Sequence, residues 1–286
     1  MKQWRSEYPV EIMARVLDVS RSGFYAWLGR PPSARALEDE RLKVAITAAH
    51  AKTRETYGAK RLHLELKAEG VEVGRDRIAR LRRELGIFCK QKRRFKATTQ
   101  SNHNLPVAEN LLGQCFEATA PNEVWHTDIT YLPTGEGWLY LAGVKDQFTC
   151  ELVGYAMGSR MTQELVGQAL WRAIRYQHPA AGLIHHSDRG SQYCALDYQR
   201  LLKQHGLLAS MSGKGNCYDN APMESFWGSL KTELVHHRCY ETRAEAEASI
   251  QEYIEIFYNR QRRHSRLGYV APAVFAQNFR KQQQAA

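Results

Sequence analysis

The sequence predicts an α/β core, a mixed sheet with flanking helices, that follows an all-helical region. Three observations predict this fold class. Apolar residues recur with helical spacing through residues 1–88, the spacing is lost over 89–121, and strand-like segments followed by alternating helices and strands fill 122–286. With 286 residues, 43% of them apolar, the chain can bury a sizeable core. We therefore expect a helical region, a basic linker and an α/β domain with C-terminal helices, in these three ranges.

The helical region divides into two helical pairs. Residues 10–28 have the pattern of a helix-turn-helix, in which Ser20 or Ser22 can cap the second helix. Pro31 and Pro32 then break the chain. Further helices are predicted over 34–52, 57–69 and 75–85.

Positive charge is concentrated in the N-terminal part. Residues 1–120 hold 23 Lys and Arg against 14 Asp and Glu, which gives nine of the ten excess charges. Ten basic residues lie within 74–96, a run that suits a polyphosphate partner such as DNA, although a solvated helix face with a basic tail has the same composition. The residues expected to contact DNA are Arg75, Arg82, Arg83, Lys92, Arg93 and Arg94.

From residue 122 the pattern changes to that of a mixed sheet covered by helices. Three β-rich segments, 123–132, 138–145 and 150–157, suggest an antiparallel meander. Strands at 183–186 and 207–211 alternate with helices expected at 162–177 and 194–204, and the chain is predicted to be largely helical from 220, with a helix over 242–263.

The same sequence argues against several classes of protein. No run approaches 18 apolar residues, and the first ten residues lack the apolar core of a secretory signal. The six cysteines lie at least 22 positions apart, so no CxxC pair can form a zinc knuckle or redox centre. We expect a cytoplasmic protein with reduced thiols.

Three acidic residues stand where strands end or a helix begins. Asp128 lies in one predicted strand, Asp188 follows another, and Glu224 opens a helix. Such side chains can converge on one cleft. Each acid also has a purely structural explanation, because Asp and Glu accept hydrogen bonds in turns and stabilise helix N-termini.

The helix that begins near Glu224 has a distinct apolar face. At 100° per residue, one narrow stripe is formed by Met223, Trp227, Leu230 and Leu234. Glu224 and Lys231 lie about 90° from this stripe, with Gly228 between them. Burial of the stripe would leave Glu224 beside Lys231, where the lysine could bind a phosphate, and an ordinary surface ion pair is the alternative.

Histidines and arginines near the acids are further candidates. His126 and His186 each precede an aspartate by two residues and share its face, so they could orient the acids or contact DNA, unless they are hydrogen-bonded core histidines. His185 points the opposite way and is expected to be structural. Arg189 could contact phosphate or cap its neighbour. A C-terminal row expected to face DNA or solvent is formed by Arg260, Arg262, Arg263 and Arg266.

Four motifs follow one another over about residues 120–275: WHTDITYL, HHSDRGSQY, NCYDNAPMESFWGSLKTEL and YIEIFYNRQRRHSRLGYVAP. In this order they resemble the transposases of bacterial insertion sequences that have a retroviral-integrase-like core, most closely the second-frame product of the insertion sequence 3 group. The upstream segment YGAKRLHLELKAEGVEVGRDRIARLRRELGI resembles the helical module that precedes this core in the group.

The resemblance implies a ribonuclease-H-like fold in which Asp128, Asp188 and Glu224 hold two divalent cations. Carboxylate oxygens suit Mg²⁺ or Mn²⁺, and two cations about 4 Å apart can activate the attacking oxygen and stabilise the leaving oxygen of a phosphoryl displacement. The implied activity is DNA strand cleavage and strand transfer at the ends of the chain's own insertion sequence.

The resemblance also implies partners. These are the element ends, target DNA and further copies of the chain, assembled on DNA. In the group, an upstream frame contributes another helix-turn-helix and a coiled coil, and because this sequence has no sustained heptad pattern, the upstream-frame product is a further expected partner. Two alternatives remain at this point: a DNA-binding regulator without catalysis, and a structure-selective nuclease that cuts without joining.

Overall fold

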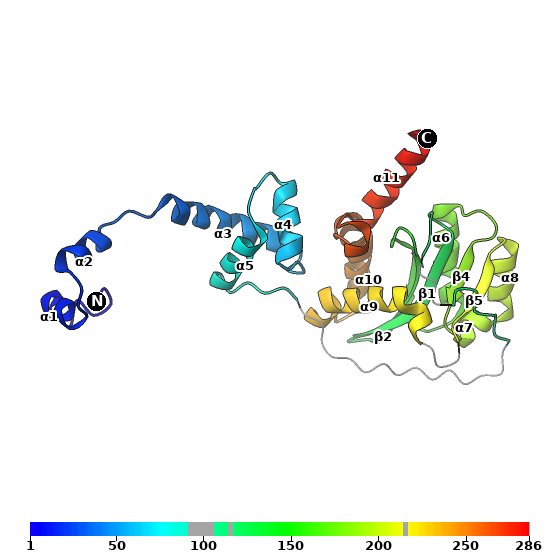
Figure 1. Cartoon of the computed structure of the whole chain (residues 1–286). Coiled ribbons are helices and arrows are strands. Elements are labelled where there is room, and N and C mark those ends of the chain that lie inside the picture. Colours follow the sequence, from blue (N-terminus) through cyan, green and yellow to red (C-terminus); the bar gives the residue numbers. More distant parts are fainter. Residues whose placement is uncertain (91–105, 114–116, 214–216, 286) are drawn as a thin grey trace.

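The computed structural model describes residues 1–90, 106–113, 117–213 and 217–285 (Figure 1). A helical region is followed by an α/β domain, in the order that the sequence predicted. None of the described helices is both long enough and apolar enough to cross a membrane.

The helical region begins with α1 (Val10–Val16) and α2 (Arg21–Leu28). Ser20 Oγ accepts a hydrogen bond from Gly23 N at 3.2 Å, and this bond caps α2 as expected. Most of the large apolar side chains of this pair are exposed, and Ala14 and Phe24 are the two that the structure buries within 10–28.

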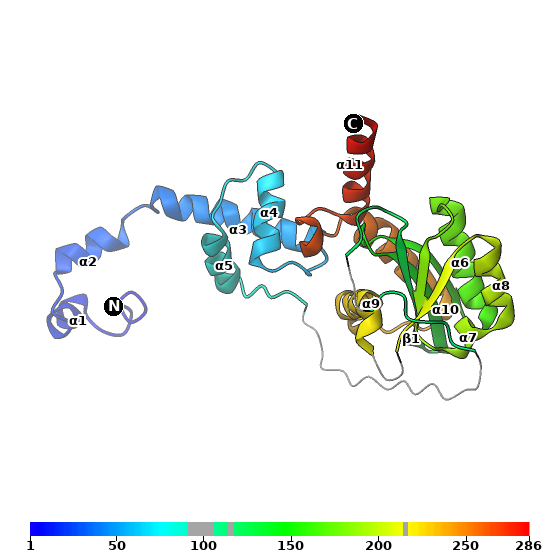
Figure 2. The ribbon, with the colours of Figure 1, turned by 45° about the vertical axis from the view of Figure 1, so that its right-hand side comes forward.

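A compact bundle follows, made of α3 (Ala34–Lys52), α4 (Ala59–Ala68) and α5 (Arg75–Glu84). The apolar positions at helical spacing meet in one core, in which Ile46, Leu62 and Ile78 are fully buried. The bundle lies between the α1–α2 pair and the α/β domain in both views (Figure 1 and Figure 2). The three helices fall within two residues of their predicted bounds.

The α/β domain is built on a five-stranded mixed sheet. Its strands are β1 (Val124–Thr134), β2 (Gly137–Asp146), β3 (Leu152–Gly158), β4 (Ile184–Ser187) and β5 (Leu208–Met211). The spatial order is β3-β2-β1-β4-β5, where β1 to β3 form the predicted antiparallel meander and β4 and β5 run parallel to β1. The predicted fold class is confirmed.

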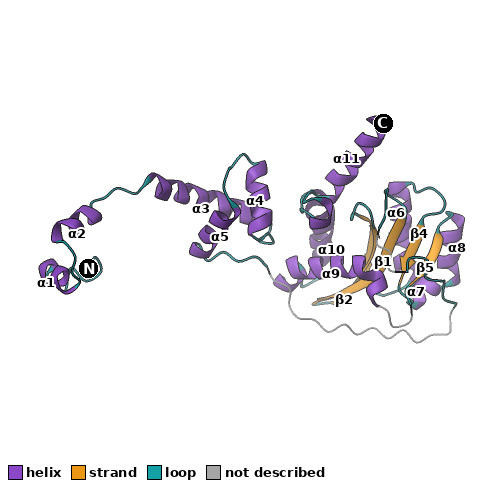
Figure 3. Ribbon diagram, viewed as in Figure 1, coloured by secondary structure: helices purple, strands orange, loops and turns teal. Residues whose placement is uncertain are grey.

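Helices cover both faces of this sheet (Figure 3). One core joins the sheet to α6 (Gln163–Gln177), α7 (Ser191–Cys194) and α8 (Leu196–Gln204). A second core joins the opposite face to α9 (Ala221–Glu233) and α10 (Arg243–Glu252). Because strand side chains alternate between faces, Trp125 enters the first core, whereas His126 and Asp128 face the second.

Two segments differ from the sequence prediction. The expected helix over 242–263 is instead divided, since α10 ends at Glu252 and a π-helical segment follows over Tyr253–Tyr258, before α11 (Pro272–Ala285). Residues 106–113, expected in the linker, lie along β5, where Leu111 N donates to Ser210 Oγ at 3.0 Å. This contact spans 99 positions, so local composition could not predict it.

Candidate active site

Asp128 and Asp188 come from neighbouring parallel strands. The register of β1 and β4 pairs His126 with His186, and each aspartate lies two residues further along its own chain. Asp188 directly follows the last residue of β4. The sheet therefore brings the two aspartates to equivalent positions, which the sequence could suggest but not establish.

Asp128 is held in place by α9 and by its own backbone. Asp128 Oδ2 accepts a hydrogen bond from Trp227 Nε1 at 3.0 Å, and Oδ1 accepts one from Ile129 N at 2.8 Å. Trp227 lies over Gly143, the β2 residue that pairs with Asp128. A Cβ at Gly143 would stand 2.9 Å from the Trp227 ring, so glycine is what allows the indole to reach the carboxylate.

Glu224 lies in the first turn of α9, three residues before Trp227, and its side chain is exposed. Burial, and then the negative charge of Asp188, raise the pKa of Asp128 to about 7, and Glu224 adds to this effect. The three acids therefore share one electrostatic neighbourhood. They do not form a closed ligand set, because nowhere in the described ranges do three His, Cys, Asp or Glu side chains stand close enough together to hold a metal ion.

Asp188 and Arg189 shape the other side of the site. Asp188 Oδ1 accepts a hydrogen bond from Gly190 N at 2.9 Å, in the turn that leads into α7. Arg189 Nε donates to the backbone oxygen of Ser212 at 2.6 Å, which ties the turn to the chain after β5. The contact of Arg189 with phosphate stays a prediction, whereas its structural role, the bond to Ser212, is seen directly.

The histidines next to the acids are core residues. His126 and His186 are fully buried, and their ring centres lie 5.5 Å apart in an edge-to-face pair. His186 Nδ1 lies 2.9 Å from Ser210 Oγ, and His126 Nδ1 lies 3.2 Å from the side-chain oxygen of Asn220. Burial lowers the pKa of both rings to about 4, so they are neutral at pH 7. This burial favours the hydrogen-bonded core role among the alternatives, and direct contact of the two histidines with DNA stays a prediction.

Two residues that the sequence analysis did not single out, Asn220 and Lys145, connect the sheet to the start of α9. Asn220, which immediately precedes α9, contacts His126 and donates to the backbone oxygen of Thr127 at 3.0 Å. Lys145 is buried on β2, and its Nζ donates to the backbone oxygen of Pro222 at 2.9 Å. Burial lowers the pKa of Lys145 to about 8. The available signal was a lysine inside the apolar run LAGVKD.

The apolar stripe of α9 is buried as predicted, at Met223, Trp227, Leu230 and Leu234. Lys231 is partly buried, and its ammonium nitrogen lies 5.4 Å from the centre of the Tyr131 ring on β1. Burial lowers the pKa of Lys231, while the charge of Asp128 raises it. This is direct electrostatic coupling between Lys231 and the carboxylate site.

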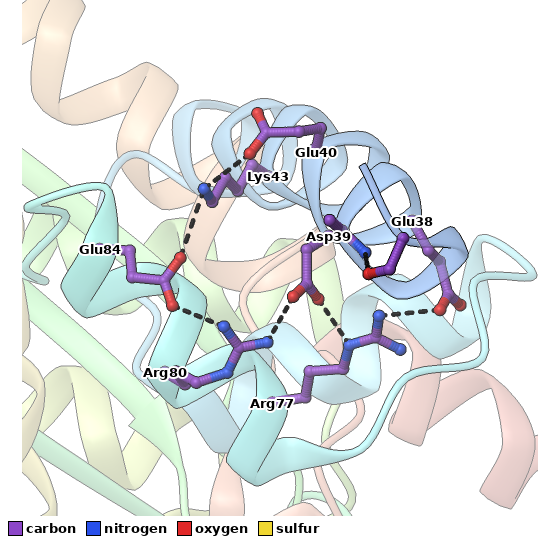
Figure 4. A network of polar contacts seen from close by, with 9 residues as sticks. Glu38, Asp39, Glu40, Lys43, Arg77, Arg80 and Glu84 are labelled. Carbon is purple, nitrogen blue, oxygen red and sulfur yellow. Dashed lines mark hydrogen bonds and ion pairs between the residues drawn. The ribbon is translucent and has the colours of Figure 1, made fainter. Parts of the chain in front are cut away.

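The basic helix α5 is more fully neutralised than its own sequence suggests. Arg77 and Arg80 form ion pairs with Asp39 of α3, at 2.8 and 2.6 Å (Figure 4). The guanidinium groups, Arg80 first, lower the pKa of Asp39. Figure 4 shows the same network extending along α3 and α5 through Glu38, Glu40, Lys43 and Glu84.

The predicted DNA contacts on this helix lie outside that network. Arg75 and Arg83 are exposed, and Arg75 pairs with the adjacent Asp76 at 3.0 Å. Arg82 is half-buried, with its Nε inaccessible to solvent. Three further candidates lie outside the described residues: Lys92, Arg93 and Arg94.

Two of the C-terminal arginines are structural. Arg262 is buried against Glu233 of α9, with Nη2 to Oε1 at 2.6 Å, and the same carboxylate accepts from the Tyr253 hydroxyl at 2.7 Å. Arg263 Nε donates to Glu65 Oε2 of α4 at 2.8 Å, which joins the helical bundle to the α/β domain. Both were predicted to bind DNA; these long-range carboxylates give them a structural role, and their contact with DNA stays a prediction. Arg260 is exposed.

The chain therefore has a mixed sheet in which Asp128 lies on β1 and Asp188 directly follows the adjacent parallel strand β4, with Glu224 on the later helix α9. Residues 118–217 and 224–282 match the integrase core domain family, and residues 37–95 match an HTH-like domain. Two relatives cover nearly the whole chain. The 31 kDa protein of insertion element IS600 from Shigella sonnei is 64% identical, covering 93% of this chain and 98% of the relative.

The transposase InsF for insertion sequence IS3A from Escherichia coli K12 is 42% identical, covering 96% of each chain. The chain therefore belongs to the family of insertion-sequence transposases with an integrase core domain.

Solved integrase structures are more distant. A simian T-cell lymphotropic virus intasome in complex with a PP2A regulatory subunit has a TM-score of 0.47 and 14% identity, covering 81% of this chain and 74% of that one. The HTLV-2 integrase catalytic core domain in complex with magnesium has a TM-score of 0.44 and 13% identity, covering 56% of this chain and 99% of that one.

Proposed function

We propose that this chain is a metal-dependent DNA transposase that cleaves and joins DNA strands at the ends of its own insertion sequence. The observation that carries the proposal is the placement of Asp128 and Asp188 at equivalent positions of β1 and β4, with Glu224 in the first turn of α9. Membership in the transposase family supplies the class of reaction.

The three carboxylates fit divalent cations by their chemistry. Asp128, Asp188 and Glu224 offer hard oxygen ligands, which Mg²⁺ and Mn²⁺ prefer, and the neighbouring histidines are buried and hydrogen-bonded elsewhere. Two bound cations would supply activation of the attacking oxygen and stabilisation of the leaving oxygen in an in-line displacement. Burial first, and then the negative charges of Asp188 and Glu224, raise the pKa of Asp128, and a bound cation would oppose both effects by favouring the charged carboxylate.

The chain's own residues hold this geometry. Trp227 fixes one oxygen of Asp128, and the Gly190 amide fixes one oxygen of Asp188. Lys145 and Asn220 hold the start of α9 against the sheet and thereby place Glu224. Lys231 supplies a positive charge beside the acids for a DNA phosphate.

DNA binding outside the catalytic centre falls to the helical region and the basic segment after it. In the described part of α5, Arg75 and Arg83 have exposed side chains that could meet phosphates, and Arg82 borders them. We further propose that the chain acts in the cytoplasm as an oligomer on DNA, and that the upstream-frame product of the same element is a partner.

The proposal is tested with purified protein, Mn²⁺ and radiolabelled element-end DNA. Wild-type protein should release ends with 3′-hydroxyls and join them to a second DNA, whereas Glu224→Gln and Asp188→Asn should do neither. Asp197→Asn is the matched control, because Asp197 is an exposed acid on α8 that pairs with Arg200. Cutting without joining would identify a nuclease. Equal products from wild-type protein and Glu224→Gln would remove Glu224 from the site.

A further inference from the structure

The β1–β2 hairpin carries an exposed aromatic pair close to the acids. The side chains of Tyr131 and Trp138 are 45% and 50% exposed. Their ring centres lie 5.0 Å apart in an edge-to-face arrangement, with Tyr140 next to Tyr131 at 6.5 Å. We call Tyr131 and Trp138 the aromatic platform.

The aromatic platform does not contribute to either hydrophobic core of the α/β domain, as far as the described residues show. The next residues along the same strands, Leu132 and Leu139, are fully buried in the core beneath α9. The hairpin is therefore anchored by its leucines, and stability gives no reason to expose two large aromatic rings on its other side. Exposed aromatic side chains grouped at one place indicate a binding surface.

The position of the aromatic platform and the positive charge beside it indicate what kind of molecule binds there. Tyr131 is three residues beyond Asp128 on β1, roughly 10 Å along the strand, and its side chain leaves the opposite face of that strand, so Lys231 is what connects it to the acids. The ammonium group of Lys231 stands 5.4 Å from the centre of the Tyr131 ring, and Lys231 belongs to the helix that carries Glu224. A cation and flat aromatic rings together are the combination that binds the backbone and the bases of an unpaired nucleic-acid strand.

We propose that the aromatic platform stacks on unpaired DNA bases next to the phosphate that reacts at the acids. This inference rests on the proposed function, because the acids must be where the DNA reacts. At roughly 3.4 Å per nucleotide of a stacked strand, the platform meets a base about three nucleotides from the reacting phosphate. Stacking compensates for the base pairs that must open when a duplex end enters the active site. Lys231 binds the phosphate that lies between the acids and the platform.

The test compares Trp138→Ala with Trp171→Ala. Trp171 on α6 is also 50% exposed and also has a cation over its ring, from Arg175 at 5.1 Å, so it is a matched control. Each full-length variant is assayed for joining of element ends whose last three base pairs are paired or mismatched. Trp138→Ala should lose roughly 5- to 150-fold on paired ends, the range expected for one stacked base. The loss should be smaller on mismatched ends, and Trp138→Phe should restore activity on both.

A second measurement reads binding without catalysis. Element-end DNA carrying 5-iodo-2′-deoxyuridine within three nucleotides of the reacting phosphate is cross-linked by ultraviolet light to the wild-type protein, and the attachment is mapped by mass spectrometry. Attachment at Tyr131 or Trp138 supports the platform. Attachment only at other residues overturns it.

The two proposals can fail separately. Joining by wild-type protein, with equal effects of Trp138→Ala and Trp171→Ala on both kinds of end, would overturn the platform and leave the transposase function intact. Cross-linking at the platform in a protein that makes no products would contradict the transposase function, and it would show that the platform contacts DNA without placing it next to a reacting phosphate. A change in oligomeric state of Trp138→Ala, with equal losses on paired and mismatched ends, would overturn the platform in favour of a contact between copies of the chain.

Discussion

At the scale of single residues, the position of Asp128 depends on the absence of a Cβ atom at Gly143, its partner on β2. Gly143 has no Cβ, so the Trp227 ring can lie over β2 while its N–H reaches Asp128 Oδ2. Neither residue was a site candidate from the sequence, because Gly143 lies in an apolar strand and Trp227 belongs to an apolar helix stripe. The role of Gly143 and Trp227 follows from the cross-strand pairing of Asp128 with Gly143, which is seen only in the folded chain.

This dependence predicts a selective effect of Gly143→Ala. The added methyl would stand 2.9 Å from the Trp227 ring and 3.2 Å from Met223, so it must displace the indole and remove the hydrogen bond to Asp128. We expect strand joining to fall strongly and the free energy of unfolding to drop by about 1–3 kcal/mol, the usual cost of overpacking. Urea unfolding and a joining assay measure the two effects.

The control is Gly167→Ala on α6, where an added Cβ meets no atom within 4 Å. It should leave joining unchanged and stability unchanged or increased, because alanine favours helices. If Gly143→Ala joins DNA as well as the wild type, the indole contact is not needed to place Asp128.

At the scale of secondary-structure elements, periodicity predicted nearly every helix and strand, because each buries one face of a regular pattern. Turns and packing between distant elements were not predictable in this way. The division of 242–263 into α10 and a π-helical segment accompanies the burial of Arg262 against Glu233, a residue 29 positions away. An arginine row in sequence looks the same whether carboxylates of the fold or phosphates of DNA neutralise it.

Arg262→Ala is predicted to affect stability more than DNA binding. The change would leave Glu233 buried with the Tyr253 hydroxyl but without its cation, at a cost of about 3–5 kcal/mol in the free energy of unfolding. Urea denaturation measures this cost. Arg260→Ala, two residues earlier and exposed, should cost little, and Arg262→Ala combined with Glu233→Gln should recover part of the loss. Equal stability of the two single variants would show that Arg262 is not a structural residue.

At the scale of the whole molecule, the charge imbalance lies in the helical region and the segment after it, while the acids lie in the α/β domain. Arg263 with Glu65, and the Tyr57 hydroxyl with the Arg263 amide at 2.6 Å, connect these two parts. The sequence predicted the order of the two parts, and it proposed the three acids as the site. It could not predict which arginines the fold would use internally, because their partners lie far away in the chain.

The salt dependence of DNA binding should separate these arginines. If Arg82 and Arg83 bind phosphates, Arg82→Gln with Arg83→Gln should flatten the slope of log affinity against log salt by roughly 0.9 for each phosphate that is no longer neutralised. Arg200→Gln on α8, which removes an exposed partner of Asp197, should leave the slope unchanged. Fluorescence anisotropy at several salt concentrations measures the slopes, and an unchanged slope in the double variant would mean that this part of α5 is only a solvated surface.

Buried neutral histidines make the α/β domain sensitive to acid. Burial lowers the pKa of His185 to about 3 in the folded state, so the unfolded chain binds the proton first as the pH falls below about 6.5. Stability contributed by neutral His185 is therefore fully present above pH 6.5 and is lost as the pH falls toward 3. In His185→Gln, the free energy of unfolding should decline less steeply between pH 6 and pH 4, by about 1.4 kcal/mol per pH unit. Parallel profiles for the two proteins would contradict this burial effect.

The most direct test of the central claim is a change of metal preference at Asp188. Asp188→Cys replaces a hard oxygen ligand with a softer sulfur, so a residue that ligates the reactive cation should lose strand joining with Mg²⁺ and recover it in part with Mn²⁺. Recovery by Mn²⁺ alone is the result that we predict. Equal joining with Mg²⁺ and Mn²⁺, or an equal loss with both, would contradict a metal-dependent reaction at these carboxylates.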